Sequence, residues 1–177
     1  NVVGPGGNVA RVSLLQAGFP VTVPGVTIDR QCGSGLEAIM RGFEAIKSGQ
    51  AQIILAGGVE SVSRAPWKMA QPTRPGAMPT LYTRAPFTPA AYGDPDMGIA
   101  AEEVAARYQI TREAQDYYAF SSHQKAVTSQ RTGRFNKEIL PLQGVMTDEC
   151  PRADTSVEKL AHLHPVFLPE GTVTAGN

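Results

Sequence analysis

Apolar residues change their spacing within the first fifty positions of the chain. Residues 26–28 alternate between apolar and polar side chains, which is typical of the end of a strand, and Gly33-Ser34-Gly35 then provide a tight turn. After the turn, apolar side chains recur at three- and four-residue intervals, at Leu36, Ile39, Met40, Phe43 and Ile46. This spacing predicts a helix with one apolar face that ends at Gly49.

Two further patterns flank this helix. Residues 9–17 have the spacing of a shorter helix. Residues 52–56 form a continuous apolar run between glycines, as expected for a strand that is buried on both faces of a layered sheet. Strand, helix and strand in this order predict a βαβ unit and therefore an α/β fold.

The amino-acid composition changes after residue 60, where prolines become frequent. Closely spaced prolines between residues 61 and 96 exclude long regular elements there. A helix is expected over residues 98–108, and Thr111 is a good N-cap for a second one. Its aromatic residues Tyr117, Tyr118 and Phe120 are expected to be core contacts, and His123 is expected to face solvent.

Three details complete the expected elements. The first of these two helices carries four residues on one face, namely Ala101, Val104, Ala105 and Tyr108. Residues 138–142 indicate a short edge strand, because Pro141 cannot serve a central ladder. Residues 157–163 have the spacing of one or two helical turns.

Composition narrows the function classes. The chain has 177 residues, of which 42% are hydrophobic and 18% charged, as is ordinary for a soluble globular protein. Its formal net charge is zero, so no overall field favours nucleic acid or an anionic membrane surface. The longest apolar run is too short to span a bilayer and no leader opens the chain, which predicts a cytoplasmic protein. Cys32 and Cys150 are expected to stay reduced.

Cys32 lies where the expected strand meets the start of the expected helix. The unpaired N–H groups and the positive dipole end of a helix N-terminus favour a thiolate. Such a thiolate could attack a carbonyl, and the same N–H groups could hold the resulting oxyanion. A small buried cysteine packed at a strand end is the alternative interpretation, because free cysteine is often buried and inert.

Several segments resemble, in the same order, those of the thiolases, the acyl-CoA C-acyltransferases that make or cleave 3-ketoacyl-CoA. The cysteine segment is Asp29-Arg-Gln-Cys32-Gly-Ser-Gly-Leu-Glu-Ala38. The others are Gly7-Asn8-Val-Ala-Arg11, Leu55-Ala-Gly-Gly58-Val-Glu60-Ser, Met97-Gly-Ile-Ala-Ala-Glu-Glu-Val-Ala105 and Gly171-Thr-Val-Thr-Ala-Gly-Asn177. Together they extend over nearly the whole chain.

The resemblance implies a layered αβαβα fold, of which the chain would hold part of the N-terminal half. Residues 1–60 would then be core that includes the nucleophile Cys32, and residues 61–170 a loop domain that covers the active site and binds CoA. Residues 171–177 would begin the strand that returns to the core.

The resemblance also implies a reaction. Cys32 would take an acyl group from acyl-CoA and pass it to acetyl-CoA, or run the reverse cleavage of 3-ketoacyl-CoA with CoA. The family's remaining catalytic segments, Gly-His-Pro, Cys-x-Gly and Asn-Glu-Ala-Phe, do not occur in this sequence, so the chain alone is expected to be inactive. CoA thioesters would be the substrates, with no further cofactor, and the full-length protein would be a homodimer or homotetramer.

Three residues match CoA- or substrate-binding positions of the family: Met97, Arg152 and Ala175. Core packing for Met97 and a solvated surface position for Arg152 are the alternatives. The sequence departs from the family pattern at Asp29, Asp96 and Lys159, which leaves the acyl chain length open. The pair His162 and His164 lacks a carboxylate or thiol cluster, so no metal site is expected.

Two other functions stay open. Related ketoacyl synthases also place a nucleophilic cysteine at a strand-to-helix turn, although they lack the proline-rich loop domain and the Met97-Gly98 segment. A non-catalytic CoA-binding or assembly module is the other possibility. Binding without acylation of Cys32 would distinguish it from the enzyme.

Overall fold

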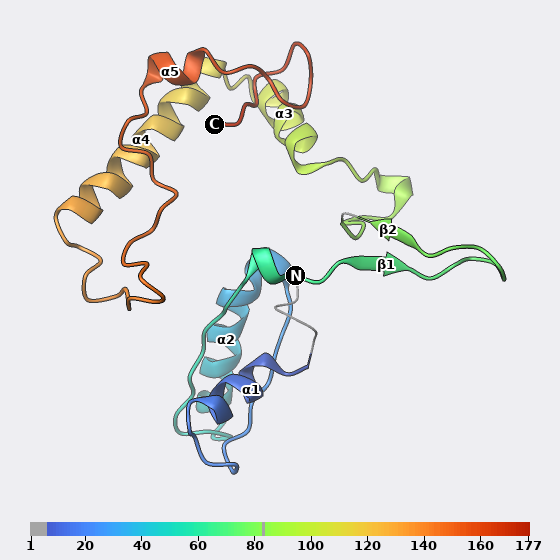
Figure 1. Cartoon of the computed structure of the whole chain (residues 1–177), viewed down its shortest axis with the longest axis vertical. Coiled ribbons are helices and arrows are strands. Elements are labelled where there is room, and N and C mark those ends of the chain that lie inside the picture. Colours follow the sequence, from blue (N-terminus) through green and yellow to red (C-terminus); the bar gives the residue numbers. More distant parts are fainter. Residues whose placement is uncertain (1–6, 83) are drawn as a thin grey trace. The chain divides into compact units, whose positions relative to one another are not determined.

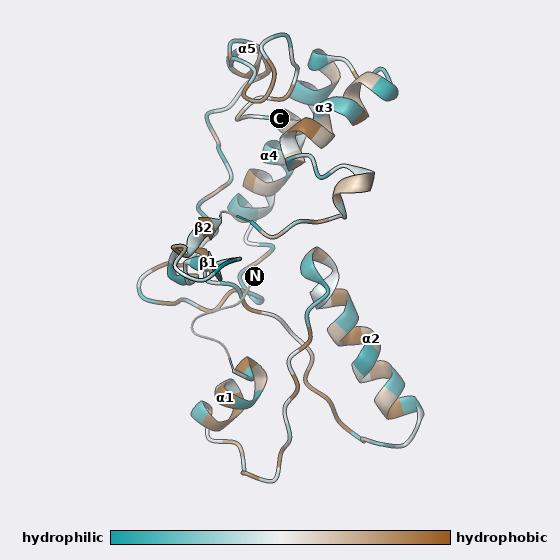
Figure 2. Cartoon of the chain, turned by 90° about the vertical axis from the view of Figure 1, so that its right-hand side faces the viewer, coloured by the Kyte–Doolittle hydropathy of each residue, from teal (hydrophilic) through white to brown (hydrophobic). Residues whose placement is uncertain are grey.

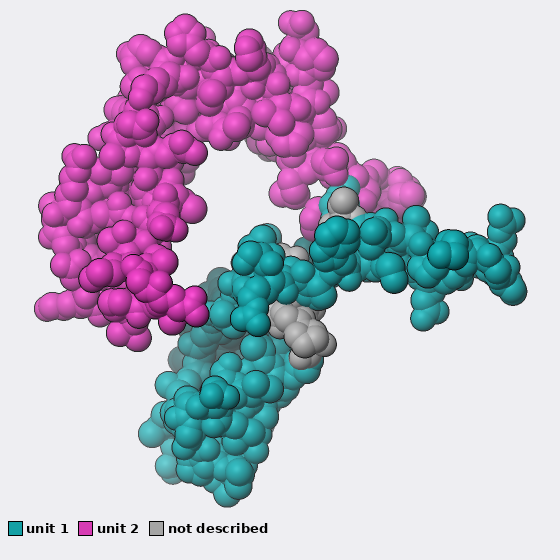
Figure 3. Space-filling view, in the orientation of Figure 1, with its two compact units in different colours: residues 1–85 teal, residues 86–177 magenta. Residues whose placement is uncertain are grey.

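The computed structural model describes residues 7–82 and 84–177. Residues 1–6, which the sequence assigns to the first core segment, lie outside the described residues. The chain forms two compact units, Asn1–Ala85 and Pro86–Asn177 (Figure 1 and Figure 3). The boundary between these units falls within the proline-rich stretch.

The first unit begins with helix α1, Val9–Gln16, close to the predicted range. Its N-cap is Asn8, whose side-chain oxygen accepts hydrogen bonds from the Arg11 amide at 3.1 Å and the Thr27 hydroxyl at 2.8 Å. The Asn8 amide group also donates to the Gly25 carbonyl at 2.6 Å. These contacts tie the connector after α1 back onto the start of the helix.

The 3₁₀ turn η1, Gln31–Gly33, leads directly into helix α2, Ser34–Lys47. Ser48 is the C-cap of the helix, and Gly49 follows with φ +76°, a left-handed conformation that favours glycine. The predicted helix is confirmed. Its apolar face, visible as recurring brown segments in Figure 2, is exposed to different degrees, with Leu36 at 65% and Met40 at 44%.

The two strands expected beside α2 do not form a ladder. In the described part of the chain the paired strands are β1, Lys68–Ala70, and β2, Thr80–Tyr82, which are antiparallel with Met69 opposite Leu81. A strand needs a hydrogen-bonded neighbour, and residues 26–28 and 52–56 find none among the described residues. Residues 52–56 still contact α2, because a Cβ placed on the buried Gly42 would lie 3.1 Å from Ile54 Cγ2.

The second unit contains helices α3, Met97–Arg107, α4, Arg112–Arg131, and α5, Val157–Ala161. Thr111 caps α4 as predicted, with its hydroxyl oxygen accepting a hydrogen bond from the Ala114 amide at 3.2 Å. Short 3₁₀ turns lie at Val62–Arg64 in the first unit (η2) and Ala90–Tyr92 in the second (η3). The edge strand expected over residues 138–142 is reduced to a single bridge between Leu142 and Val145.

The buried face of α3 differs from the predicted one. Of the predicted face, Ala105 is buried as expected, but its buried neighbours are Gly98 and Glu102, whereas Val104 is 49% and Tyr108 67% exposed. The apolar pattern was misleading because Glu102 can be buried here: its carboxylate accepts several hydrogen bonds, which offset the cost of removing it from water.

Two of the three aromatic residues expected in the core of α4 are also exposed, Tyr117 to 64% and Tyr118 to 78%. Phe120 is intermediate. The fully buried side chain of α4 is Asp116, which is 1% exposed and takes part in a polar network described below. Within residues 7–82 and 84–177, no helix has both the length and the apolar character needed to cross a membrane.

Candidate active site

Cys32 is an exposed, free thiol in the middle of η1, one turn before the body of α2. Gly33 is the N-cap of α2 and has no side chain to bond the amides of the first turn. The expected location at a helix start is therefore confirmed. The alternative of a buried cysteine packed at a strand end does not agree with the exposure of the side chain.

The residue before the cysteine has an unusual backbone. Gln31 has φ +51°, in the left-handed region that non-glycine residues adopt only at a cost. Its amide donates to Asp29 Oδ1 at 2.7 Å, and its carbonyl accepts from the Ser34 hydroxyl at 2.7 Å. The same hydroxyl accepts a hydrogen bond from the Arg30 amide at 2.8 Å. Side chains on both sides of Cys32 therefore hold this turn.

A cluster of charges lies on the first turns of α2. Glu37 accepts from Arg30 Nη1 at 2.7 Å and from Arg41 Nε at 2.9 Å. Hydrogen bonds from Arg30 and then Arg41 lower the pKa of Glu37 below its ordinary value. Because both of its oxygens are engaged, this carboxylate is held as an anion paired with two guanidinium groups rather than free to approach the cysteine.

Met97 is the first residue of α3 and is 68% exposed. This exposure disfavours the alternative of simple core packing within the second unit. The assignment of Met97 to CoA or substrate binding stays a prediction.

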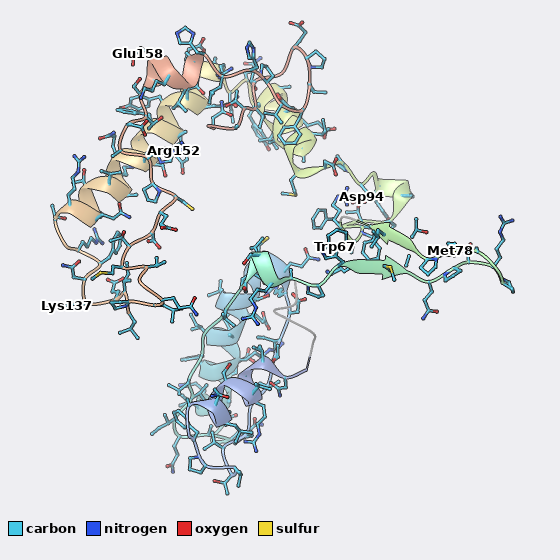
Figure 4. All side chains as sticks on the ribbon, viewed as in Figure 1. Trp67, Met78, Asp94, Lys137, Arg152 and Glu158 are labelled. Carbon is cyan, nitrogen blue, oxygen red and sulfur yellow. The ribbon has the colours of Figure 1, made fainter. Side chains whose placement is uncertain are left out.

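Arg152 is exposed on the segment that follows α4 (Figure 4). Its backbone amide donates to His123 Nδ1 at 3.1 Å, and Gln130 Nε2 donates to the Asp148 carbonyl at 2.8 Å, so this segment runs along α4. The expectation that His123 only faces solvent was wrong, because its ring accepts this bond and is partly buried. The Arg152 side chain stays accessible to solvent.

Ala175 is exposed, but the segment around it is firmly held. Asn177 accepts from the Thr174 amide at 2.8 Å and donates to Asp116 Oδ1 at 2.8 Å and the Thr172 carbonyl at 3.1 Å. Arg112 in turn donates to both oxygens of Asp116, at 3.0 and 2.9 Å. The terminal segment is thereby fixed to α4 by groups that are largely buried.

Glu102 fixes the same segment to α3. Its carboxylate accepts from the amides of Thr172, at 3.0 and 2.9 Å to its two oxygens, and Val173, at 2.8 Å, and from the Thr172 hydroxyl at 3.1 Å. Burial alone would raise the pKa of Glu102, but these hydrogen bonds outweigh burial and lower it. The helix that begins at Met97 and the segment that carries Ala175 are thus parts of one bonded assembly.

The sequence predictions missed the residues that hold these segments in place. Cys32 belongs to the first unit, whereas Met97, Arg152 and Ala175 belong to the second. Nothing in the apolar spacing pointed to the residues that support them: Asp29, Ser34, Glu102, Asp116 and Asn177.

The remaining titratable groups do not form a metal centre in the part of the chain that the structure describes. No group of three or more His, Cys, Asp or Glu side chains is arranged there to hold an ion. Cys150 is exposed and free, like Cys32.

Comparison with known sequences gives a consistent family. Residues 2–177 match the model of the thiolase N-terminal domain. VraB of Staphylococcus epidermidis, provisionally named an acetyl-CoA C-acetyltransferase, is 46% identical over 185 residues, which cover 100% of this chain and 47% of that protein. VraB of Staphylococcus aureus is 45% identical over 183 residues, with 100% and 48% covered.

Solved structures that resemble this chain belong to the same family as the matching sequences. An acetyl-CoA acetyltransferase of Bacillus anthracis superposes with a TM-score of 0.84 at 38% identity, over 96% of this chain and 46% of that one. Human mitochondrial 3-ketoacyl-CoA thiolase in complex with CoA superposes with a TM-score of 0.86 at 35% identity, over 100% and 48%. The chain spans about half the length of these relatives and has part of their layered α/β fold. It belongs to the thiolase family, of which it represents the N-terminal domain.

Proposed function

We propose that this chain supplies the nucleophile of a thiolase, with Cys32 as the residue that carries the acyl group. The observation that carries the proposal is the exposed thiol of Cys32 at the start of α2, on a turn fixed by side chains on either side of it. An exposed thiol at a helix N-terminus has the accessibility and the electrostatic setting that a nucleophile needs.

In the first half-reaction, Cys32 Sγ attacks the thioester carbonyl of acyl-CoA. The bond from the carbonyl carbon to the CoA sulfur breaks, the acyl group stays on Cys32, and CoA leaves as a thiol with the proton lost from Cys32. The amides of the first turn of α2 are suited to hold the negative oxygen of the tetrahedral intermediate. In the second half-reaction, the α-carbon of acetyl-CoA gives up a proton to a base and attacks the acyl carbonyl. A carbon–carbon bond forms, the bond from the acyl carbon to Cys32 Sγ breaks, and the released thiolate takes up a proton.

The proton transfers of the second half-reaction need groups that this sequence does not contain. The family's Gly-His-Pro and Cys-x-Gly segments are absent from residues 1–177. The proposal therefore concerns the full-length protein, and it assigns to this chain the covalent step and part of substrate binding.

Within the second unit, we assign Met97, Arg152 and Ala175 to CoA and substrate binding. Arg152 presents an exposed guanidinium, a group that forms paired hydrogen bonds with phosphate, and CoA carries several phosphates. Residues 61–170 are proposed to act as the loop domain over the active site. A full-length homodimer or homotetramer in the cytoplasm completes the proposal.

The test is the mass of the full-length protein after brief mixing with acetyl-CoA, followed by peptide mapping. One acetyl group on the peptide that contains Cys32 is expected. Cys150→Ser is the matched control, because Cys150 is the other exposed free thiol, and this variant should still be acetylated. Cys32→Ser should not give an acetylated thiol.

Absence of an adduct in the unmodified protein while CoA raises its melting temperature would overturn the enzyme proposal. It would favour a CoA-binding module instead. Equal acylation by acyl carrier protein and CoA thioesters would point to the ketoacyl synthase alternative.

A further inference from the structure

The turn before Cys32 combines a costly backbone with side-chain hydrogen bonds that have no other evident role. Gln31 has φ +51°, although glycine is the residue that adopts such angles freely. Residues held in sparsely populated backbone regions persist where the surrounding structure fixes them. The groups that fix Gln31 are therefore informative about what the turn does.

Both peptide groups of Gln31 are fixed by side chains. Its N–H donates to Asp29 Oδ1 at 2.7 Å, and its C=O accepts from the Ser34 hydroxyl at 2.7 Å. The Ser34 hydroxyl also accepts from the Arg30 amide at 2.8 Å, so one oxygen joins the residues before and after the strained position. The Ser34 amide reaches the same Gln31 carbonyl, which makes this oxygen the junction between η1 and α2.

We propose that Asp29 and Ser34 are positioning residues for Cys32: together they hold Gln31 in its left-handed conformation and so keep the thiol at the start of α2. This inference rests on the proposed function, in which Cys32 is the nucleophile. Neither residue acts on the substrate. Asp29 contributes through a hydrogen-bond acceptor rather than through its charge, and Ser34 through a hydroxyl that both donates and accepts.

The geometry explains why the two residues act on Cys32 and not on the helix as a whole. If Gln31 relaxes to a negative φ, the chain turns in a different direction at the Gln31 Cα, so the peptide group that leads into Cys32 is reoriented. The thiol then leaves its place before the first-turn amides, while α2 persists from Gly35 onward through its own hydrogen bonds. We call the hydrogen bonds from Asp29 and Ser34 to Gln31 the brace. Loss of the brace should therefore change the reactivity of Cys32 more than it changes the fold.

The readout is the alkylation rate of each cysteine by iodoacetamide in the full-length protein, followed by peptide mass. Cys150 is an internal reference, because it is exposed and lies outside the turn. Ser34→Ala and Asp29→Ala should each lower the ratio of Cys32 to Cys150 alkylation by about twofold to fivefold, with the larger effect for Ser34→Ala, which loses two side-chain hydrogen bonds where Asp29→Ala loses one. Asp29→Asn keeps an acceptor oxygen and should keep the ratio.

The matched control is Ser48→Ala at the other end of α2. The Ser48 hydroxyl also donates to a backbone carbonyl, that of Ala45 at 3.1 Å, but it lies far from the turn. This variant should leave the alkylation ratio unchanged. Its melting temperature gives the baseline for losing a serine hydroxyl from this helix.

The decisive variant is Gln31→Gly, because glycine adopts a positive φ without the steric cost. In a Ser34→Ala background, Gln31→Gly should restore the ratio, since the turn no longer needs the brace. For acetyl transfer from acetyl-CoA, Ser34→Ala should lower kcat while KM stays unchanged.

Three results would overturn the proposal: a Ser34→Ala ratio equal to that of the unmodified protein, no restoration by Gln31→Gly, or an Asp29→Asn ratio as low as that of Asp29→Ala. Failure of the proposed function is distinguishable from these results. Unmodified protein that alkylates as expected but accepts no acetyl group at Cys32 would reject the thiolase chemistry and leave the brace standing.

Discussion

The contacts inside the first unit differ in kind from those inside the second. In the first unit, the side-chain hydrogen bonds of the described residues join positions fewer than twenty residues apart, such as Asn8 with Gly25. In the second, Glu102 reaches Thr172 across 70 residues and Arg112 reaches the Leu160 carbonyl across 48. Gly42 is the buried residue of the described first unit, whereas the second unit buries the polar residues Glu102, Asp116 and Thr174 together with the apolar residues Ala105, Val127 and Leu160.

The difference in buried residues indicates which contacts stabilise each unit. The second unit buries polar groups that satisfy one another, so removing one partner leaves a buried group uncompensated. The first unit leaves the apolar face of α2 exposed, with Phe43 at 64%, and relies on caps and turns. Substitutions of similar chemistry should therefore have larger effects in the second unit.

The largest expected effect is that of Arg112→Ala. The guanidinium donates to Asp116, whose side chain is 2% exposed, and to the carbonyls of Leu160 and Leu163. Its removal leaves a buried carboxylate without its countercharge, which we expect to cost about 3–5 kcal/mol. Urea unfolding monitored by circular dichroism would measure it, and a cost below that of a helix cap would contradict the expectation that substitutions cost more stability in the second unit than in the first.

The next effect concerns Glu102→Gln, which keeps the shape but weakens the bonds to Thr172 and Val173. A loss of about 2 kcal/mol is expected, because hydrogen bonds to a charged acceptor are stronger than those to a neutral one. Hydrogen exchange of the two amides is the local measurement. Their protection should fall while that of the amides in α2 stays constant.

The same carboxylate gives a pH dependence. The folded pKa of Glu102 is lower than the ordinary value of 4.5, so its contribution to stability is complete above about pH 4.5 and is lost as the pH falls through the folded pKa. Stability measured between pH 6 and pH 3 should fall less steeply in Glu102→Gln than in the unmodified protein. Parallel curves would show that Glu102 does not drive this part of the acid sensitivity.

A smaller effect is expected in the first unit for Asn8→Ala, which removes the N-cap of α1 and the bond to Gly25. The loss should be about 1 kcal/mol, the usual value for a cap. Asn8→Asp keeps the capping oxygen but cannot donate to the Gly25 carbonyl, so it should recover only part of the loss. Thermal unfolding of both variants is the measurement. A loss as large as that of Arg112→Ala would contradict the expectation that substitutions cost less stability in the first unit than in the second.

The smallest effect is expected for Arg41→Ala. Arg41 is 65% exposed, and Glu37 keeps its bond to Arg30 after the substitution. Exposed ion pairs contribute little and are screened by salt, so the unfolding midpoint should not move beyond experimental error at physiological ionic strength. A clear shift would show that the charge cluster on α2 is part of a wider network.

The sequence predicted the helices well and the strands poorly. Helix α2 and the cap at Thr111 follow from neighbouring residues, because a helix bonds within its own segment. Residues 52–56 have the composition of a buried strand, but a ladder needs a partner that local sequence does not specify. The location of Cys32 at the start of a helix could be predicted, because a glycine-containing turn before an apolar helix is a local signal.

The supporting residues could not be predicted for the same reason. The hydrogen bonds of Glu102 depend on where residues 172 and 173 return in space, and apolar spacing along α3 placed the buried face on Val104 instead. The brace at Gln31 depends on a backbone angle that its side chain does not favour. Polar burial and positive φ are both decided by the tertiary structure.

The reach of Glu102 also has a consequence for synthesis of the protein. Its hydrogen-bond donors lie 70 residues further along the chain, so α3 leaves the ribosome with this carboxylate still hydrated. At the usual translation rates of roughly 5–20 residues per second, the wait is on the order of 4–14 seconds. During that interval the face of α3 that carries Gly98 and Ala105 stays in contact with solvent, so this part of the second unit can close only after the terminal segment has been made.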